Sequence, residues 1–410
     1  MSAGLGIYHD ETEVSYAVDF GRDREPTQKR SRHPEYRRKG SGPTRVSGMH
    51  CRRNKRWTWG SGRGARMQNA RAFAGCLAFA VASLAVNAFG ITIDYRFITN
   101  PGNAANTNTW GAVADVFKMA ATETTNAQYV EFLNTVDPTG ANTNAIYNTQ
   151  MQNQSNGGIS FNAGGSSGSK YTVKSGTAPS GSAYTNMPVT YVTWFSAARF
   201  ANWLNNGATG ASSTETGAYT LNGQTGGAIV ARNSGATVYL PSRDQWYKAG
   251  FYNGSAYTTW ATNSNATPTN TVSNLSLANA ANYGDVATPT VGPLSVGSYT
   301  NTTSSYGLYD MIGNLTEMTD TINGGNANQY QQFSGNWQIS TGNIVNWNAT
   351  AAARWGASAV GSTGGPALGF RVAAVPEPGT IALAGMGIAG LAGLDWMKRR
   401  KKRLAARQVV

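Results

Sequence analysis

The stretch Gly307-Leu308-Tyr309-Asp310-Met311-Ile312-Gly313-Asn314-Leu315-Thr316-Glu317 carries two carboxylates seven positions apart. They bracket a Gly-Asn turn whose backbone carbonyls can point inward. Carboxylate and carbonyl oxygens are the hard ligands that calcium prefers. A structural interpretation is the alternative: Asp310 caps a turn and Glu317 pairs with an arginine.

Three segments elsewhere in the chain have helical patterns that begin with a capping residue. Thr125–Gln128 is a capping box, and Tyr129, Phe132, Leu133 and Val136 then share one face. Ser242–Gln245 repeats this device after a strand end at Val238–Pro241. Short strands, turns and capped helices between long polar loops predict the α+β class, with much irregular backbone.

The second of the three helices is predicted to start at Thr193, directly after a short strand over Pro188–Val192. Its helical periodicity divides the residues between two faces. The inward face is predicted to hold Trp194, Ala197, Ala198, Ala201 and Leu204, and the face toward water Arg199, Asn202 and Asn205.

Five ordered blocks resemble the formylglycine-generating enzyme family, also called sulfatase-modifying factor domains. The fold that this resemblance implies is an irregular α+β architecture related to C-type lectins, with few short strands and two or three main helices. The blocks extend over Glu123–Leu133, Pro188–Leu204, Leu240–Trp246, Gly307–Glu317 and Gly369–Val372.

The resemblance also implies a structural calcium site. The matching positions give as ligands the side chains of Asp310 and Glu317 and the carbonyls of Gly313 and Leu315. Asn282-Tyr283 is similar to the start of a second calcium site of the family, but no later aspartate matches it.

The chain departs from the family after Ser334-Gly335-Asn336-Trp337, where active members carry two copper-binding cysteines. The segment Gln338–Trp347 contains neither thiol, so we expect no copper and no catalytic residues. The side chains of Trp337, Trp347, Arg354 and Trp355 are candidates for a carbohydrate or peptide groove, or for the core.

Composition excludes further chemistry. All three histidines and both cysteines of the 410 residues precede residue 91, which excludes a catalytic triad with histidine and a thiolate or imidazole metal site in the body. Residues 1–66 hold 15 basic and 7 acidic side chains and residues 376–410 hold 7 and 2, which leaves 11 of each sign between them. The neutral body therefore predicts no nucleic-acid partner.

Segments at both ends indicate export. Residues 67–90 combine a positive start, an apolar run and small residues near Ala88, as in a signal peptide; a buried core helix is the alternative. Residues 1–66 are expected to be a basic disordered segment, or a start codon placed upstream of the true one. The domain itself is predicted over 91–375.

Residues 376–403 resemble the PEP-CTERM sorting signal of Gram-negative bacteria, and 404–410 form the C-terminal end. They contain Pro376-Glu377-Pro378, an apolar helix that could span a membrane over 381–397, and a basic tail. This resemblance implies processing by an exosortase after transit in the membrane, and release to the cell surface or extracellular matrix. An ordinary C-terminal membrane anchor is the alternative.

These observations predict an exported, non-catalytic scaffold or binding module, with extracellular polysaccharide as its partner. A formylglycine-generating oxidoreductase that acts on a sulfatase cysteine is the alternative function. An enzyme that uses only oxygen ligands is a third hypothesis.

Overall fold

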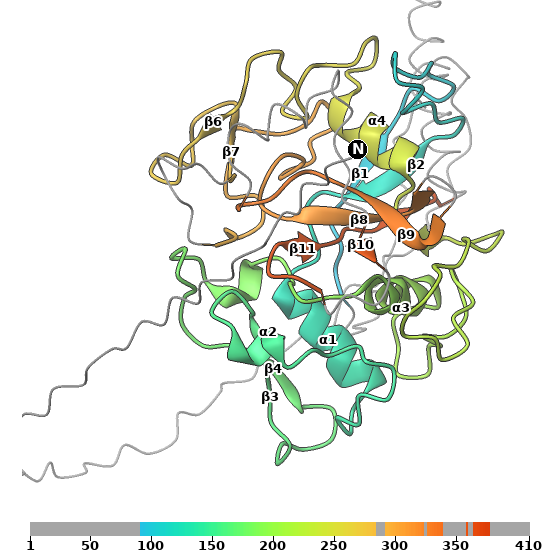
Figure 1. Ribbon diagram of the computed structural model, residues 1–410, viewed down its shortest axis with the longest axis vertical. Coiled ribbons are helices and arrows are strands. Elements are labelled where there is room, and N and C mark those ends of the chain that lie inside the picture. The colour runs from blue at the N-terminus through green and yellow to red at the C-terminus, as the bar shows by residue number, and fades with distance from the viewer. Residues whose placement is uncertain (1–90, 284–291, 324–325, 339–357, 360–363, 378–410) are drawn as a thin grey trace, which may run out of the picture. The chain divides into compact units, whose positions relative to one another are not determined.

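The structure is a computed structural model that describes residues 91–283, 292–323, 326–338, 358–359 and 364–377 (Figure 1). All of these residues belong to one compact unit, Leu84–Val410. The predicted segments 1–66 and 67–90 and the predicted apolar helix over 381–397 lie outside the described residues. The domain boundaries therefore remain predictions.

One four-stranded sheet joins the first strands of the domain to its last. Its order is β1-β2-β12-β5, and each neighbouring pair is antiparallel. Because β12 lies between β2 and β5, the C-terminal residues of the domain form an inner strand. The strands are β1 (Tyr95–Ile98), β2 (Phe117–Ala120), β5 (Val238–Tyr239) and β12 (Ala373–Ala374).

A second sheet has the order β10-β9-β8-β11. Strand β11 is parallel to β8 and pairs Gly369 with Glu317, whereas the other neighbours are antiparallel. This register brings residues just after Gly369 close to Glu317. The strands are β8 (Thr316–Asn323), β9 (Asn326–Phe333), β10 (Ser358–Ala359) and β11 (Leu368–Gly369).

Two small sheets of two strands each complete the β structure of the described residues. One pairs β3 (Ile159–Phe161) with β4 (Tyr171–Val173) in antiparallel orientation, and the other pairs β6 (Thr269–Asn270) with β7 (Ala280–Ala281) in parallel.

The three predicted helices are confirmed, and each begins with a complete capping box. They are α1 (Asn126–Val136), α3 (Trp194–Asn205) and α4 (Arg243–Phe251), capped by Thr125, Thr193 and Ser242. In each, the cap side chain accepts from the third backbone N–H, and the third side chain bonds back to the cap N–H. Two shorter elements are α2 (Gln150–Asn153) and the 3-10 helix η1 (Tyr184–Asn186).

The strand predicted over Pro188–Val192 is wrong. Pro188 makes a single bridge to Thr125, and Tyr191 has a φ of +59°, in the left-handed region that a strand residue cannot adopt. The segment is instead an irregular approach to α3.

Aromatic side chains hold the helices to each other and to the second sheet. Phe132 of α1 packs against Phe200 and Trp203 of α3, with ring centroids 5.4 Å apart in both pairs. On α4, Trp246 stacks on Phe333 of β9 at 5.0 Å. Figure 1 shows β8 and β9 between α4 and the α1–α3 pair, and Trp194 of α3 donates to a β8 carbonyl oxygen. This arrangement confirms the α+β class with few short strands.

Candidate functional site

The turn that opens the predicted calcium segment runs through left-handed backbone. Asp310, Gly313 and Asn314 have φ values of +56°, +79° and +58°. Gly313 is required here, because a Cβ would lie 2.3 Å from the carbonyl oxygen of Asn282. The hydroxyl of Ser334 donates to the carbonyl oxygen of Gly313 at 2.9 Å, which fixes the turn from the opposite side.

Glu317 follows this turn as the second residue of β8 and pairs with Arg371, two residues after β11. Both side chains are fully buried. The Arg371 Nε donates to one carboxylate oxygen at 2.7 Å, and its terminal nitrogen donates to the other at 2.6 Å. The indole Nε1 of Trp246 adds a third hydrogen bond at 2.8 Å. Glu317 therefore accepts hydrogen bonds from three N–H donors. The structural interpretation of the motif, in which Glu317 pairs with an arginine, describes the observed contact.

Arg371 uses the rest of its guanidinium on backbone carbonyls. It donates to Ala120 at 3.1 Å, to Ala121 at 3.2 Å and to Tyr309 at 2.9 Å. Burial lowers the pKa of Arg371, but the carboxyl groups of Glu317, Glu123 and Asp310 together raise it by more, so this pKa lies above its ordinary value. A guanidinium that is fully charged and fully hydrogen-bonded thus ties the end of β2 to the loop before β8.

Two further carboxyl groups lie near Arg371. Glu123 is 1% exposed, and its Oε1 accepts from the Asn314 side chain at 3.1 Å. Its Oε2 accepts no hydrogen bond from the described residues, and its carboxyl group lies close enough to that of Asp310 for the two to share a hydrogen bond. Asp310 accepts from the Gly297 N–H at 2.6 Å. Burial raises the pKa of both groups, and the charge of Asp310 raises that of Glu123 further.

We name the set Glu123, Asp310, Glu317 and Arg371 the arginine cluster. It joins one positive charge to three carboxyl groups. A nucleophile activated by a histidine or a thiolate cannot occur in it, because neither residue type follows residue 90. The arrangement is suited to cross-linking segments that are far apart in the chain, from residue 120 to residue 371.

The residues predicted to bind calcium have other hydrogen-bond partners in this arrangement. Glu317 already accepts from three donors, and an added cation beside it would face the Arg371 guanidinium. The carbonyl oxygen of Gly313 accepts from Ser334. Within the described part of the chain, no group of three or more His, Cys, Asp or Glu side chains is arranged to hold a metal ion. The calcium site remains a prediction that a binding measurement must test.

Of the predicted ligand groove, the structure describes only Trp337. This side chain is half-buried, and its indole N–H donates to the Pro366 carbonyl oxygen at 3.3 Å. Trp347, Arg354 and Trp355 lie outside the described residues. The groove therefore stays a prediction.

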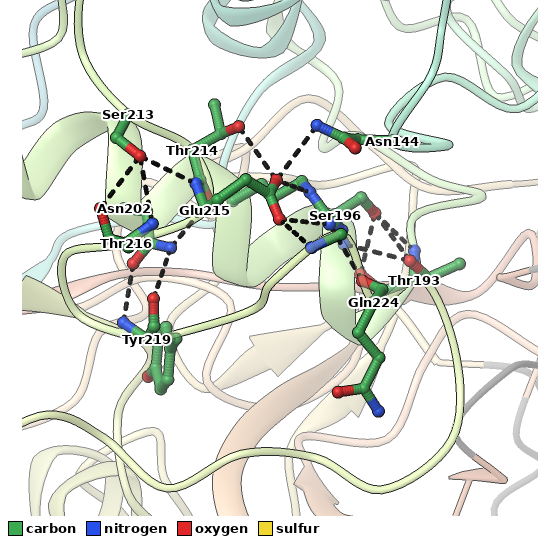
Figure 2. A network of polar contacts seen from close by, with 12 residues as sticks. Asn144, Thr193, Ser196, Asn202, Ser213, Thr214, Glu215, Thr216, Tyr219 and Gln224 are labelled. Atoms are coloured by element: carbon green, nitrogen blue, oxygen red, sulfur yellow. Dashed lines mark hydrogen bonds and ion pairs between the residues drawn. The ribbon is translucent and has the colours of Figure 1, made fainter.

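Figure 2 shows a second polar cluster, which the sequence pattern does not predict. Arg199 and Asn202 were predicted to face water, but both are fully buried under the loop that follows α3. Arg199 donates to both oxygens of Glu215 at 2.7 and 3.0 Å, and Asn202 donates to the Thr214 and Tyr219 carbonyl oxygens. The helical periodicity could not reveal this, because it takes the polar face to be solvent-exposed. The threonine- and glycine-rich composition of residues 206–224 is the only signal in the sequence for a loop that covers this helix face.

The fold and the arginine cluster together define a class: an α+β domain with short strands, fastened by buried ion pairs and without a thiol. Residues 94–375 match the sequence pattern of the sulfatase-modifying factor enzyme 1-like domain. The chain belongs to this family. Residues 374–401 match the PEP-CTERM protein-sorting motif, which indicates an exported, sorted protein and implies processing by an exosortase.

Three solved structures that match 70% of the chain share little sequence with it. CarF is 20% identical, covers 70% of this chain and 99% of its own, and has a TM-score of 0.43. Variable protein 1 of Treponema denticola is 17% identical, with 70% and 98% covered and a TM-score of 0.40. PvdO from Pseudomonas aeruginosa is 14% identical, with 70% and 93% covered and a TM-score of 0.37. A search of curated proteins gives no match.

Among the residues that the structure describes, none forms a helix long and apolar enough to cross a membrane.

Proposed function

We propose that the protein is a non-catalytic member of its family that acts outside the cytoplasm as a scaffold or polymer-binding module. The observation that carries this proposal is chemical. From residue 91 onward the chain contains no cysteine and no histidine, so the family's copper-thiolate chemistry has no ligand. The buried charges described above cross-link the fold.

The sorting motif supports the finer location that we propose. An apolar run over 381–397 followed by the basic residues 398–403 favours transit as a membrane-anchored form with a cytoplasmic tail. Exosortase processing would then release the domain to the surface or extracellular matrix of a Gram-negative bacterium.

Extracellular polysaccharide is the ligand class that we propose. The body carries equal numbers of acidic and basic residues, which suits a neutral, hydrated polymer better than a charged one. Trp337 is half-buried and the next residue, Gln338, is exposed, so an aromatic residue and an amide residue follow each other in the sequence. Stacking faces with amide donors and acceptors suit sugar rings.

A co-sedimentation experiment tests the binding. The exported chain is mixed with insoluble matrix polysaccharide from a producing bacterium, and bound protein is measured. Trp337→Ala is expected to reduce binding about fivefold or more, since a stacked aromatic contributes about 1 kcal/mol or more. The matched control is Tyr306→Ala, another half-buried aromatic, whose hydroxyl bonds to the Thr99 carbonyl oxygen. Failure of the wild-type protein to sediment with any matrix polymer contradicts the binding proposal.

The alternative oxidoreductase is favoured only by the activity for which the family is named. Incubating the protein with copper, oxygen and a cysteine-bearing sulfatase peptide separates the two functions. We expect no aldehyde product by mass spectrometry, and its appearance would overturn the non-catalytic proposal.

A further inference from the structure

The sorting motif and the folded domain share residues. The family match ends at residue 375, and the sorting-motif match begins at residue 374. Residue 374 belongs to β12, the inner strand of the first sheet, where Ala374 pairs with Lys118 on one side and Val238 on the other. No linker therefore separates the sheet from the segment that an exosortase must recognise.

The contacts continue past the end of the strand and into the motif. The Val375 N–H donates to the carbonyl oxygen of Thr237 at 2.9 Å, which extends the pairing with the segment before β5 by one residue. Pro376 is buried. Because proline has no N–H to donate, it ends the strand at this point and keeps the preceding residue extended.

Glu377, the acidic centre of the motif, forms an ion pair with Lys118 of β2. The Lys118 side chain is 10% exposed and the Glu377 side chain is 66% exposed. The lysine is therefore packed in the folded domain, whereas the glutamate lies at the surface and pairs with it there. The Lys118 ammonium also lies 5.2 Å from the ring centroid of Tyr95. Burial raises the pKa of Tyr95, and the charge of Glu377 raises it further, which agrees with a close arrangement of these three groups.

A bound exosortase would need access to the same atoms. Proteins that read an extended segment contact its backbone and alternate side chains. Here the backbone at Val375 is hydrogen-bonded, the Pro376 ring is covered, and the carboxylate of Glu377 is paired. When residues 375–377 leave the sheet, the nearly buried Lys118 also loses Glu377 as its ionic partner.

We propose that the folded domain keeps its own sorting motif inaccessible through the ion pair between Lys118 and Glu377. An exosortase then acts on the chain only when residues 375–377 are released from the first sheet. The ion pair sets the fraction of time for which the motif is open. The rate of processing then depends on local opening at this end of the domain rather than on unfolding of the whole.

The test is pulse-chase labelling of the full chain in a host that contains the exosortase, with conversion to the processed form followed over time. Lys118→Met keeps the length of the side chain and removes its charge. It is expected to raise the conversion rate about two- to fivefold, the factor to which a partly exposed ion pair corresponds. Lys118→Arg keeps the charge and is expected to convert at the wild-type rate.

Two controls separate the effect of losing the Lys118–Glu377 ion pair from the effect of general destabilisation. Thr193→Ala weakens the capping box of α3 without touching the motif and is expected to leave the rate unchanged. Inserting Gly-Ser-Gly between Val375 and Pro376 leaves the domain intact and moves Glu377 away from Lys118, so it is expected to raise the rate even if Lys118→Met does not fold. An unchanged or slower rate in the insertion variant overturns the proposal, as does an equal acceleration by Thr193→Ala.

Discussion

At the scale of single residues, the arginine cluster contains more carboxyl groups than positive charges. One guanidinium lies near three carboxyl groups, and it forms a bidentate pair with only one of them, Glu317. The excess negative charge is reduced by the raised pKa values of Glu123 and Asp310, which favour their protonated forms. The stability of the domain should therefore depend strongly on Arg371 and on pH.

Replacing Arg371 by methionine removes the charge and leaves Glu317 buried without its ionic partner. We expect the free energy of unfolding in urea to fall by about 3–5 kcal/mol. The control is Arg243→Met, which breaks a partly exposed pair with Asp244 and should cost less than about 1 kcal/mol. If Arg371→Met costs no more than the control, the cluster does not fasten the fold.

Glu123 should make the domain less stable as the pH rises. A carboxyl group whose pKa is higher in the folded state binds its proton more tightly there, so its contribution is favourable at low pH. That contribution is lost as the pH rises from the ordinary value of 4.5 through the raised folded value. Glu123→Gln should flatten this part of the stability profile, measured by urea unfolding between about pH 4.5 and 8.

The matched control is Glu215→Gln, because the contribution of Glu215 to stability depends on pH in the opposite direction. Burial raises the pKa of Glu215, but the hydrogen bonds and charge of Arg199, together with the hydrogen bonds from Gly223 and Thr214, outweigh it and leave this pKa lowered. Its contribution is therefore present above the ordinary value and is lost on acidification. Equal pH profiles for the two variants would contradict both assignments.

At the scale of elements, the three capped helices are the part of the fold that the sequence predicts best. A capping box lies within four residues and needs no knowledge of the tertiary structure. Arg199 and Asn202 show the limit of such local patterns, because the loop that buries them comes later in the chain. The Pro188–Val192 segment shows another limit: its β-branched residues favour a strand, yet Tyr191 adopts a left-handed conformation.

The Thr193 cap should contribute measurably to stability. Its hydroxyl accepts from the Ser196 N–H at 3.1 Å, and the Ser196 side chain accepts from the Thr193 N–H at 2.8 Å. We expect Thr193→Ala to lower the free energy of unfolding by about 1 kcal/mol. Thr300→Ala, at an exposed position outside the helices and strands, serves as the control and should change it by less than about 0.5 kcal/mol. Indistinguishable values would mean that packing alone sets the start of α3.

At the scale of the whole molecule, the arginine cluster shows what sequence reasoning could and could not supply. An arginine partner for Glu317 was one of two interpretations of the motif, but its identity could not be derived. Arg371 is 54 positions away and comes close through the parallel pairing of β8 with β11. Glu123 enters the cluster from a distance of 191 residues through Asn314. Short strands leave no pattern long enough to fix such pairings in advance.

Calcium removal distinguishes the two interpretations for the intact domain. Because Arg371 already neutralises Glu317, we expect a chelator to shift the melting temperature by less than about 2 °C, where loss of a tightly bound ion would cost several kcal/mol. Isothermal titration with calcium should give no stoichiometric binding. A clear isotherm with one ion per chain would restore the predicted site and displace our interpretation of the cluster.

The position of β12 constrains how an exported chain can acquire its structure. A polypeptide that threads through a secretion channel from its N-terminal side delivers β1 and β2 early, whereas β12, the neighbour of β2 in the sheet, arrives more than 250 residues later. Until then β2 and β5 present open edges, which are aggregation-prone. These edges stay open for as long as translocation lasts, and a ribosome stalled a few codons before residue 373 would yield a chain that can never close its first sheet.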